Sequence, residues 1–342
     1  MSRRVIFSGL LLVTAGLGLA YYELIMYGIK QGVGQITLVV KAKPLTEVIS
    51  HPATPDSVRL KLKFLSKVRA FAMKEIGLAD TKNYTTYFDQ QGKEVLWVVT
   101  ACEEFRLKEY SWSFPIIGRV PYKGFFNQDE AIQEARALRA LGFDVSIRNP
   151  AGWSTLGWFR DPILSGMLDR SDGQLASLII HEMAHANIFV KDSVQFNENL
   201  ASFVGDRGAL LFMENLFGLQ SAQWKELTQE LEEEDRWNAH MLRGAKHLDS
   251  VYRSIKSLPI QSKREKKREA IQNIFSQTDT LRLSNRYPRP EEWLKRLPDN
   301  SFFMNYIRYQ ADQKELKNLY DSAFEGNLKT FIAAYRERFP YL

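Results

Sequence analysis

One motif in the sequence has residue types and a spacing that fit metal-dependent hydrolysis. It is the segment HEMAH at residues 181–185. Two histidines four residues apart lie on one face of a helix, separated by about 6 Å along its axis, so both can reach one Zn²⁺ at about 2.0–2.1 Å. Glu182 lies about 100° around such a helix from His181, where it can accept a proton from an activated water. The motif predicts a zinc site with His181 and His185 as ligands and Glu182 as general base.

A catalytic zinc needs a third protein ligand, and we expect Glu198 to supply it. Glu198 follows a break in the helical pattern at 191–196 and lies at the start of a second apolar helix. Two helices joined by a short turn pack antiparallel, so a glutamate in the first turn of the second points back toward the histidines. A metzincin-type third histidine is absent, because that position is Lys191. Asp192 is the alternative ligand, as in an aspzincin-like site.

Peptide hydrolysis also needs a hydrogen-bond donor for the oxyanion that forms at the scissile carbonyl. The candidates are Tyr306, Tyr309 and Tyr320, and we favour Tyr320. Residues 154–159 (STLGWF) are a candidate edge strand for holding an extended peptide, with a plain core strand as the alternative. The later histidines, His240 and His247, are expected on the surface of a charged helix.

The hydrophobic pattern indicates the elements that position these residues. Ser171 can cap a helix whose apolar residues lead into the motif, and nearly everything after it has helical periodicity. In the first half of the chain we expect helices at 54–77 and 127–141 and strands at 95–102 and 143–147. We expect an α+β, predominantly helical fold, with a small sheet packed on the helix pair that carries the motif and Glu198.

The composition is that of a folded protein. Of 342 residues, 45% are hydrophobic and 25% are charged, which excludes wholesale disorder. The net charge is +6, and the most basic run, 263–268 (KREKKR), is expected to be a solvated helix face. No groove-reading motif accompanies it, so we expect no nucleic-acid partner. Cys102 is the single cysteine, which excludes an intramolecular disulfide and a cysteine-based zinc site.

The N-terminus has the pattern of a membrane segment. Residues 5–22 carry no charged side chain and follow Arg3 and Arg4. About 20 apolar residues span a bilayer as a helix, and basic residues before it favour a cytoplasmic N-terminus. We expect residues 1–24 to be a membrane anchor or signal sequence. Residues 25–342 are then the zinc peptidase-like domain, α+β to about residue 170 and helical beyond it.

The chain resembles a bacterial family of predicted zinc aminopeptidases, often anchored in the envelope of Gram-negative bacteria. The resemblance covers most of the chain and rests on segments that include 44–49 (PLTEVI), 120–126 (VPYKGFF), 154–159, 181–185 and 196–198 (FNE). It implies a gluzincin-like site with His181, His185 and Glu198 as ligands. It also implies a location in the bacterial inner membrane with the catalytic domain facing the periplasm.

The chain departs from related enzymes at a few positions. Family members often carry cysteines near the positions of Ser113 and Arg119. Ser202 stands where thermolysin-like enzymes place an aspartate that orients a zinc-bound histidine, and Asp206 is a candidate for that role.

The function expected from these residues is a zinc-dependent peptidase, aminopeptidase-like, acting on peptide or protein substrates. The alternative is a membrane-anchored zinc-binding scaffold or interaction protein without hydrolytic activity. Glu182 argues against that alternative, because a structural zinc site has no use for a general base. The oligomeric state and the choice between amino- and endopeptidase activity stay open at this point.

Overall fold

The structure is a computed structural model that describes residues 21–114, 118–150 and 160–339. Helices dominate it and the sheets are small, so the predicted α+β, predominantly helical class is confirmed. The expected edge strand at 154–159 lies outside the described residues.

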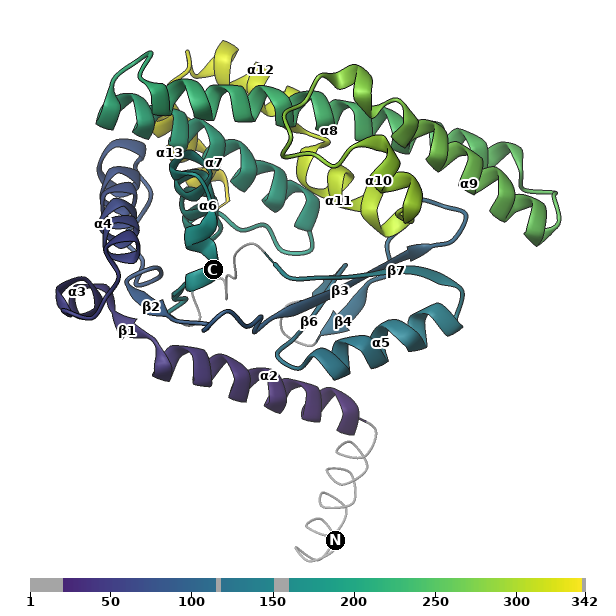
Figure 1. Ribbon diagram of the computed structural model, residues 1–342, viewed down its shortest axis with the longest axis horizontal. Coiled ribbons are helices and arrows are strands. Elements are labelled where there is room, and N and C mark those ends of the chain that lie inside the picture. The colour runs from purple at the N-terminus through teal and green to yellow at the C-terminus, as the bar shows by residue number, and fades with distance from the viewer. Residues whose placement is uncertain (1–20, 115–117, 151–159, 340–342) are drawn as a thin grey trace, which may run out of the picture.

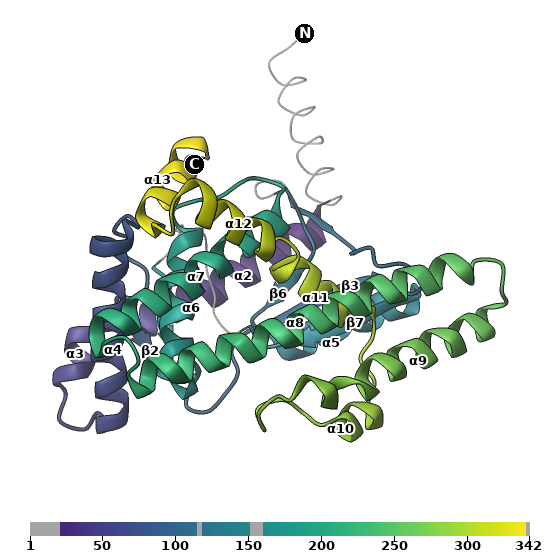
Figure 2. The same ribbon diagram turned by 90° about the horizontal axis from the view of Figure 1, so that it is seen from above.

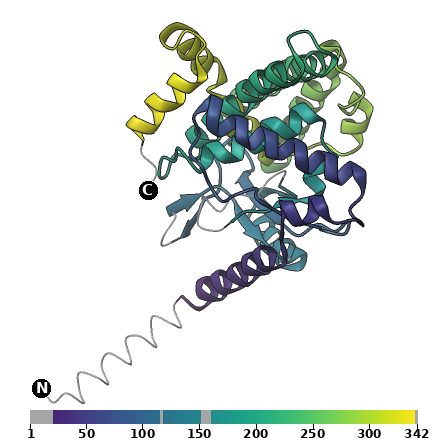
Figure 3. The ribbon, with the colours of Figure 1, turned by 90° about the vertical axis from the view of Figure 1, so that its left-hand side faces the viewer.

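The first described elements lie along one side of the molecule. They are α2 (Tyr22–Lys41), β1 (Lys43–Pro44), α3 (Leu45–Ser50), α4 (Asp56–Phe71) and the π-helical turn η1 (Ala72–Ile76). Helix α2 runs along the outer side of the body (Figures 1 and 3). The Tyr27 side chain attaches it there, stacking on Phe114 and donating a hydrogen bond to the Gly124 carbonyl. Tyr27 thus holds α2 against the strand residues Phe114 and Gly124.

The described residues form three small sheets. Besides β1, their strands are β2 (Thr86–Phe88), β3 (Trp97–Glu103), β4 (Trp112–Phe114), β5 (Gly118–Val120), β6 (Lys123–Phe125), β7 (Phe143–Arg148) and β8 (Ile163–Leu164). The sheet that bears on the site has the order β6-β3-β7 and is antiparallel, with Val99 opposite Ile147. The expected strands at 95–102 and 143–147 therefore form within one or two residues of their predicted bounds.

The β6-β3-β7 sheet has a helix on each face. On one face, Val99, Ala101 and Val145 pack against α5 (Gln128–Ala140). Because side chains alternate along a strand, Asp144 and Arg148 project from the opposite face, toward α11 (Asn300–Gln310). Figure 1 shows α5 and α11 on the two sides of this sheet.

The second half is helical. Its elements are η2 (Ser165–Asp169), α6 (Asp172–His185), α7 (Val194–Phe217), α8 (Ala222–Ser254), α9 (Ile260–Ser276), η3 (Thr278–Leu281), α10 (Pro290–Lys295), α12 (Gln313–Ala323) and α13 (Leu328–Arg338). Helices α8 and α9 lie side by side at one edge (Figure 2). Helices α6 and α7 pack closely because α7 has glycine at position 205, where an added Cβ would lie 2.8 Å from the Ser177 carbonyl oxygen.

The predicted location in the inner membrane, facing the periplasm, is contradicted. Across residues 21–114, 118–150 and 160–339, no helix is both long enough and apolar enough to cross a bilayer. The segment on which the prediction rested, 5–22, lies outside the described residues apart from its last two. Helix α2, which follows it, is too polar to span, because it includes Glu23, Lys30, Gln31 and Gln35.

Candidate metal centre

The HEMAH segment lies on a buried helix. Ser171 caps α6 as predicted, its Oγ accepting a hydrogen bond from the Gln174 backbone N–H at 3.2 Å. The apolar residues of α6, among them Leu175, Ile179 and Met183, belong to the principal hydrophobic core. Burial of this face fixes the rotation of α6 and therefore the direction in which its last turn points.

Asn197 fixes the start of α7. Its side-chain Oδ1 accepts from the Val190 N–H at 2.9 Å, and its Nδ2 donates to the Val190 carbonyl at 2.8 Å. The backbone N–H and carbonyl of the loop residue Val190 are thus both paired with Asn197, the residue before Glu198. The loop between α6 and α7 is held in one shape, and the Glu198 side chain with it.

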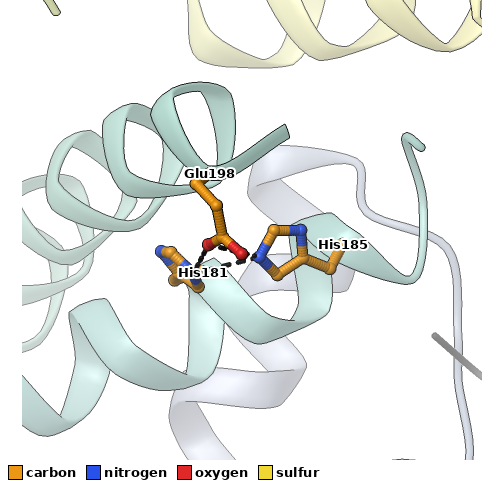
Figure 4. Close-up of side chains that lie close together, drawn as sticks. All are labelled: His181, His185 and Glu198. Atoms are coloured by element: carbon orange, nitrogen blue, oxygen red, sulfur yellow. Dashed lines mark hydrogen bonds and ion pairs between the residues drawn. The ribbon is translucent and has the colours of Figure 1, made fainter. Parts of the chain in front are cut away.

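Three side chains converge between α6 and α7 (Figure 4). The Nε2 atoms of His181 and His185 are 3.1 Å apart, and Oε2 of Glu198 is 3.5 and 3.2 Å from them. Ligand atoms about 2.0–2.1 Å from a tetrahedral zinc lie roughly 3.3 Å from one another. The donor triangle therefore already has the dimensions of a zinc site, and the cluster could hold a metal ion. The predicted assignment of these residues as ligands remains a prediction.

The electrostatics of this cluster favour a cation. Burial acts to raise the pKa of Glu198, but the two histidines outweigh it and hold that pKa far below its usual range. Burial acts to lower the pKa of His185, while the charge of Glu198 and its hydrogen bond raise it overall. The carboxylate is thus charged and directed at the two imidazoles.

Glu182 lies beside the cluster and has a partner of its own. It is buried, and burial raises its pKa against the lowering effect of both histidines. Tyr84, itself 2% exposed, lies beside this carboxylate: burial and the Glu182 charge raise the pKa of the phenol, and the phenol acts to lower the pKa of Glu182. Tyr84 has a φ of 59°, an uncommon conformation for an aromatic residue, and its N–H donates to the Asp161 carbonyl at 2.7 Å. Nothing in the sequence pattern pointed to Tyr84.

Ser202 lies nearest the outer nitrogen of His181. Its Oγ is 3.4 Å from Nδ1, while Asp206 accepts a hydrogen bond from Ser177 at 2.7 Å instead. The serine therefore lies where it can orient the imidazole so that Nε2 faces the cluster. Asp192, the alternative ligand, is directed elsewhere, since its Oδ1 accepts from the Arg119 backbone N–H at 3.3 Å.

The structure places the three candidate tyrosines in different surroundings. Tyr320 packs in the core and donates to the Gly326 carbonyl, and Tyr306 accepts a hydrogen bond from Trp237. Tyr309 instead stacks on His181, with ring centroids 6.5 Å apart and planes 25° apart. Tyr309, rather than the favoured Tyr320, therefore lies beside the cluster.

The two histidines on α8 are not part of this cluster. His247 is exposed, as expected. His240 is buried rather than on the surface, and its Nε2 bonds the Ile274 carbonyl at 2.8 Å. The helical period alone did not show that this face of α8 packs on α9.

Sequence reasoning missed two further residues near the cluster. Tyr122 lies just before β6, and burial together with the nearby charge of Glu198 raises its pKa. Arg148, at the end of β7, has its guanidinium carbon 5.9 Å from the Tyr309 ring centroid. Both residues reach the site only because the sheet packs against α11, and no local spacing signals that contact.

The fold and the cluster together define a predominantly helical α+β protein with a buried His-His-Glu group that could hold a metal. A family model described as putative aminopeptidase matches residues 26–339. The chain belongs to this family, whose name suggests peptidase activity. No curated protein and no solved structure matches the chain.

Proposed function

We propose that the protein is a zinc-dependent peptidase, aminopeptidase-like, in which Glu182 is the general base. The observation that supports it most is the triangle of donor atoms 3.1–3.5 Å apart with a buried carboxylate next to it on α6. Two imidazoles and one carboxylate are a donor set of catalytic zinc enzymes. When bound there, zinc would supply an activated water and an electrophile for the scissile carbonyl.

Glu182 is suited to move the proton. Its raised pKa makes it a stronger base than an exposed glutamate, and a better acid once protonated. It would accept the proton of the attacking water and deliver it to the leaving amine. Tyr84, beside this carboxylate, would keep it pointed at the reacting atoms.

Tyr309 is suited to stabilise the oxyanion. Burial raises its pKa, so its hydroxyl remains protonated and able to donate near neutral pH. Its ring is held against His181, which places the phenol beside the donor triangle. Tyr309 would therefore supply the donor that peptide hydrolysis requires.

A purely structural zinc site is the less suitable alternative. Structural sites close the coordination with four protein ligands, whereas the described residues supply three in this cluster. A general base next to the cluster has no purpose in such a site.

Hydrolysis of matched peptides by the purified, zinc-loaded protein tests the proposal. We expect cleavage of peptides with a free N-terminus, and loss of cleavage when the same peptides are N-acetylated. Equal cleavage of both forms would contradict aminopeptidase-like action and indicate an endopeptidase. No hydrolysis of any peptide by a protein that binds zinc stoichiometrically would contradict the peptidase proposal.

A further inference from the structure

Two arginines lie near Tyr309. The Arg148 guanidinium lies over the Tyr309 ring, 5.9 Å from its centroid. Arg308 precedes Tyr309 on α11 and acts with Arg148 to lower the pKa of both Tyr309 and Tyr122. The two phenols therefore lie near both the carboxylate of Glu198 and a pair of positive charges.

The positive charge of this pair is only partly balanced. Arg308 is 3% exposed and forms an ion pair with Glu109, whose carboxylate also lies near Arg148. Among the described residues, Arg148 has no ion pair of its own. The segments outside the description, 1–20, 115–117, 151–159 and 340–342, contain no aspartate or glutamate that could supply one. Two guanidinium groups thus share one carboxylate.

Hydrogen bonding at the pair is also incomplete. In the described part of the chain, Nε of Arg148 and Nε and Nη1 of Arg308 are buried without a hydrogen-bond partner. Buried guanidinium groups are normally paired, because an unsatisfied charged donor costs free energy. Arg148 is partly exposed, so a group from outside the protein can reach it, whereas Arg308 is enclosed.

We propose that Arg148, reinforced by the charge of Arg308, binds a carboxylate of the substrate. Guanidinium binds carboxylate through two parallel hydrogen bonds, and one such group would balance the positive charge that Glu109 leaves over. The group we favour is the free α-carboxylate of a short peptide. This inference rests on the proposed peptidase function and specifies its substrate class.

The distances agree with a short peptide. The His181 and Tyr309 ring centroids are 6.5 Å apart, and the Arg148 guanidinium is 5.9 Å from the latter. The guanidinium is therefore at most about 12 Å from the His181 ring, the span of three or four extended residues at ~3.3–3.6 Å each. The α-carboxylate always belongs to the leaving-group side of a peptide bond. If Arg148 binds this carboxylate, the enzyme would favour substrates whose C-terminus lies within a few residues of the peptide bond that is hydrolysed.

A binding experiment separates this inference from the peptidase proposal. Calorimetry would measure tripeptide binding to the zinc-loaded Glu182→Gln variant, in which turnover is blocked. The peptides are Ala-Ala-Ala with a free C-terminus, its C-terminal amide, and the amide of Ala-Ala-Asp. We expect amidation of Ala-Ala-Ala to weaken binding by about tenfold or more, the usual size of a charge-assisted pair.

Variants then assign the effect to Arg148. Arg148→Gln in the same background should weaken binding of the free acid to the level of the amide and leave the amide unchanged. Arg148→Lys, which keeps the charge and loses the paired donors, should lie between them. Arg136→Gln, an equal charge change on the exposed face of α5, should behave as the parent protein.

Each outcome decides the inference. If the Asp-containing amide binds as well as the free acid and needs Arg148, the carboxylate site is supported and its source is a side chain. Equal binding of acid and amide by protein with Arg148 intact overturns it, as does binding of no peptide. A protein that shows the preference but does not hydrolyse peptides supports the carboxylate site and contradicts only the peptidase proposal.

Discussion

Tyr84 and Glu182 lie together in the core although they are 98 positions apart in the sequence, and burial with the Glu182 charge raises the pKa of the Tyr84 phenol. Both side chains are buried, so the carboxylate has few other orientations available. Glu182 is not one of the three residues of the donor triangle, which are His181, His185 and Glu198. The roles of base and ligand can therefore be altered one at a time.

Tyr84→Phe should lower kcat by about tenfold, because the general base loses the partner that orients it. Zinc content and KM should not change, since neither depends on the phenol. Steady-state kinetics and metal analysis of the purified variant check this. An unchanged kcat would show that the Tyr84 hydroxyl has no part in positioning Glu182.

Tyr309→Phe should reduce kcat by about 100-fold while zinc binding is retained, because loss of one oxyanion donor has an effect of this size. Tyr320→Phe is the matched control. Its hydroxyl bonds the Gly326 carbonyl, so its loss should cost about 1 kcal/mol of stability and leave kcat unchanged. Parallel kinetics and denaturation of both variants check the assignment. If Tyr320→Phe lowers kcat and Tyr309→Phe does not, Tyr320 is the oxyanion donor instead.

Gly205→Ala should disrupt the metal site from a distance. Its Cβ would lie 2.8 Å from the Ser177 carbonyl and 3.1 Å from the His181 Cβ, so α6 and α7 must separate. We expect about 1–3 kcal/mol of destabilisation and weaker zinc binding. Gly28→Ala in α2 meets nothing within 4 Å and should stabilise slightly, as alanine does in a helix. Equal behaviour of both variants would contradict this account of helix packing.

Stability should depend on pH through Asp206. Burial, with repulsion from Glu234, raises its pKa to about 7. The folded state therefore keeps a proton that the unfolded state releases near pH 4, and stability falls as pH rises between these values. Asp206→Asn cannot ionise, so it should match the parent near pH 4 and exceed it by ~1–3 kcal/mol at pH 8. Urea denaturation of both proteins at each pH measures this. A variant less stable than the parent at pH 8 would contradict the sign.

Local signals in the sequence predicted the elements that carry the donor triangle. Ser171 as a cap, the apolar residues of α6 and the break before α7 are sufficient to place Glu198 near the two histidines, and the structure brings them together. The strand at 95–102 is equally visible, because it is apolar and β-branched.

The rest of the site depends on contacts that no local pattern records. Tyr84, Arg148 and Tyr309 are each separated from the motif by a long stretch of chain, and Arg148 and Tyr309 come near the cluster because α11 packs on both the β6-β3-β7 sheet and α7. The helical period could not distinguish Tyr309 from Tyr320, since both lie on amphipathic helices. It also could not show that His240 would be buried.

The zinc content and peptidase activity of Glu198→Ala and Glu182→Gln, measured side by side, test the central claim most directly. Glu198→Ala should lower zinc affinity by orders of magnitude, because it removes the charged ligand and leaves only the two histidines and solvent to bind the ion. Glu182→Gln should keep stoichiometric zinc and lose hydrolysis, because only proton transfer is removed. If Glu198→Ala keeps both zinc and full activity, or if Glu182→Gln still hydrolyses peptides at the parent rate, the proposed metal centre is contradicted.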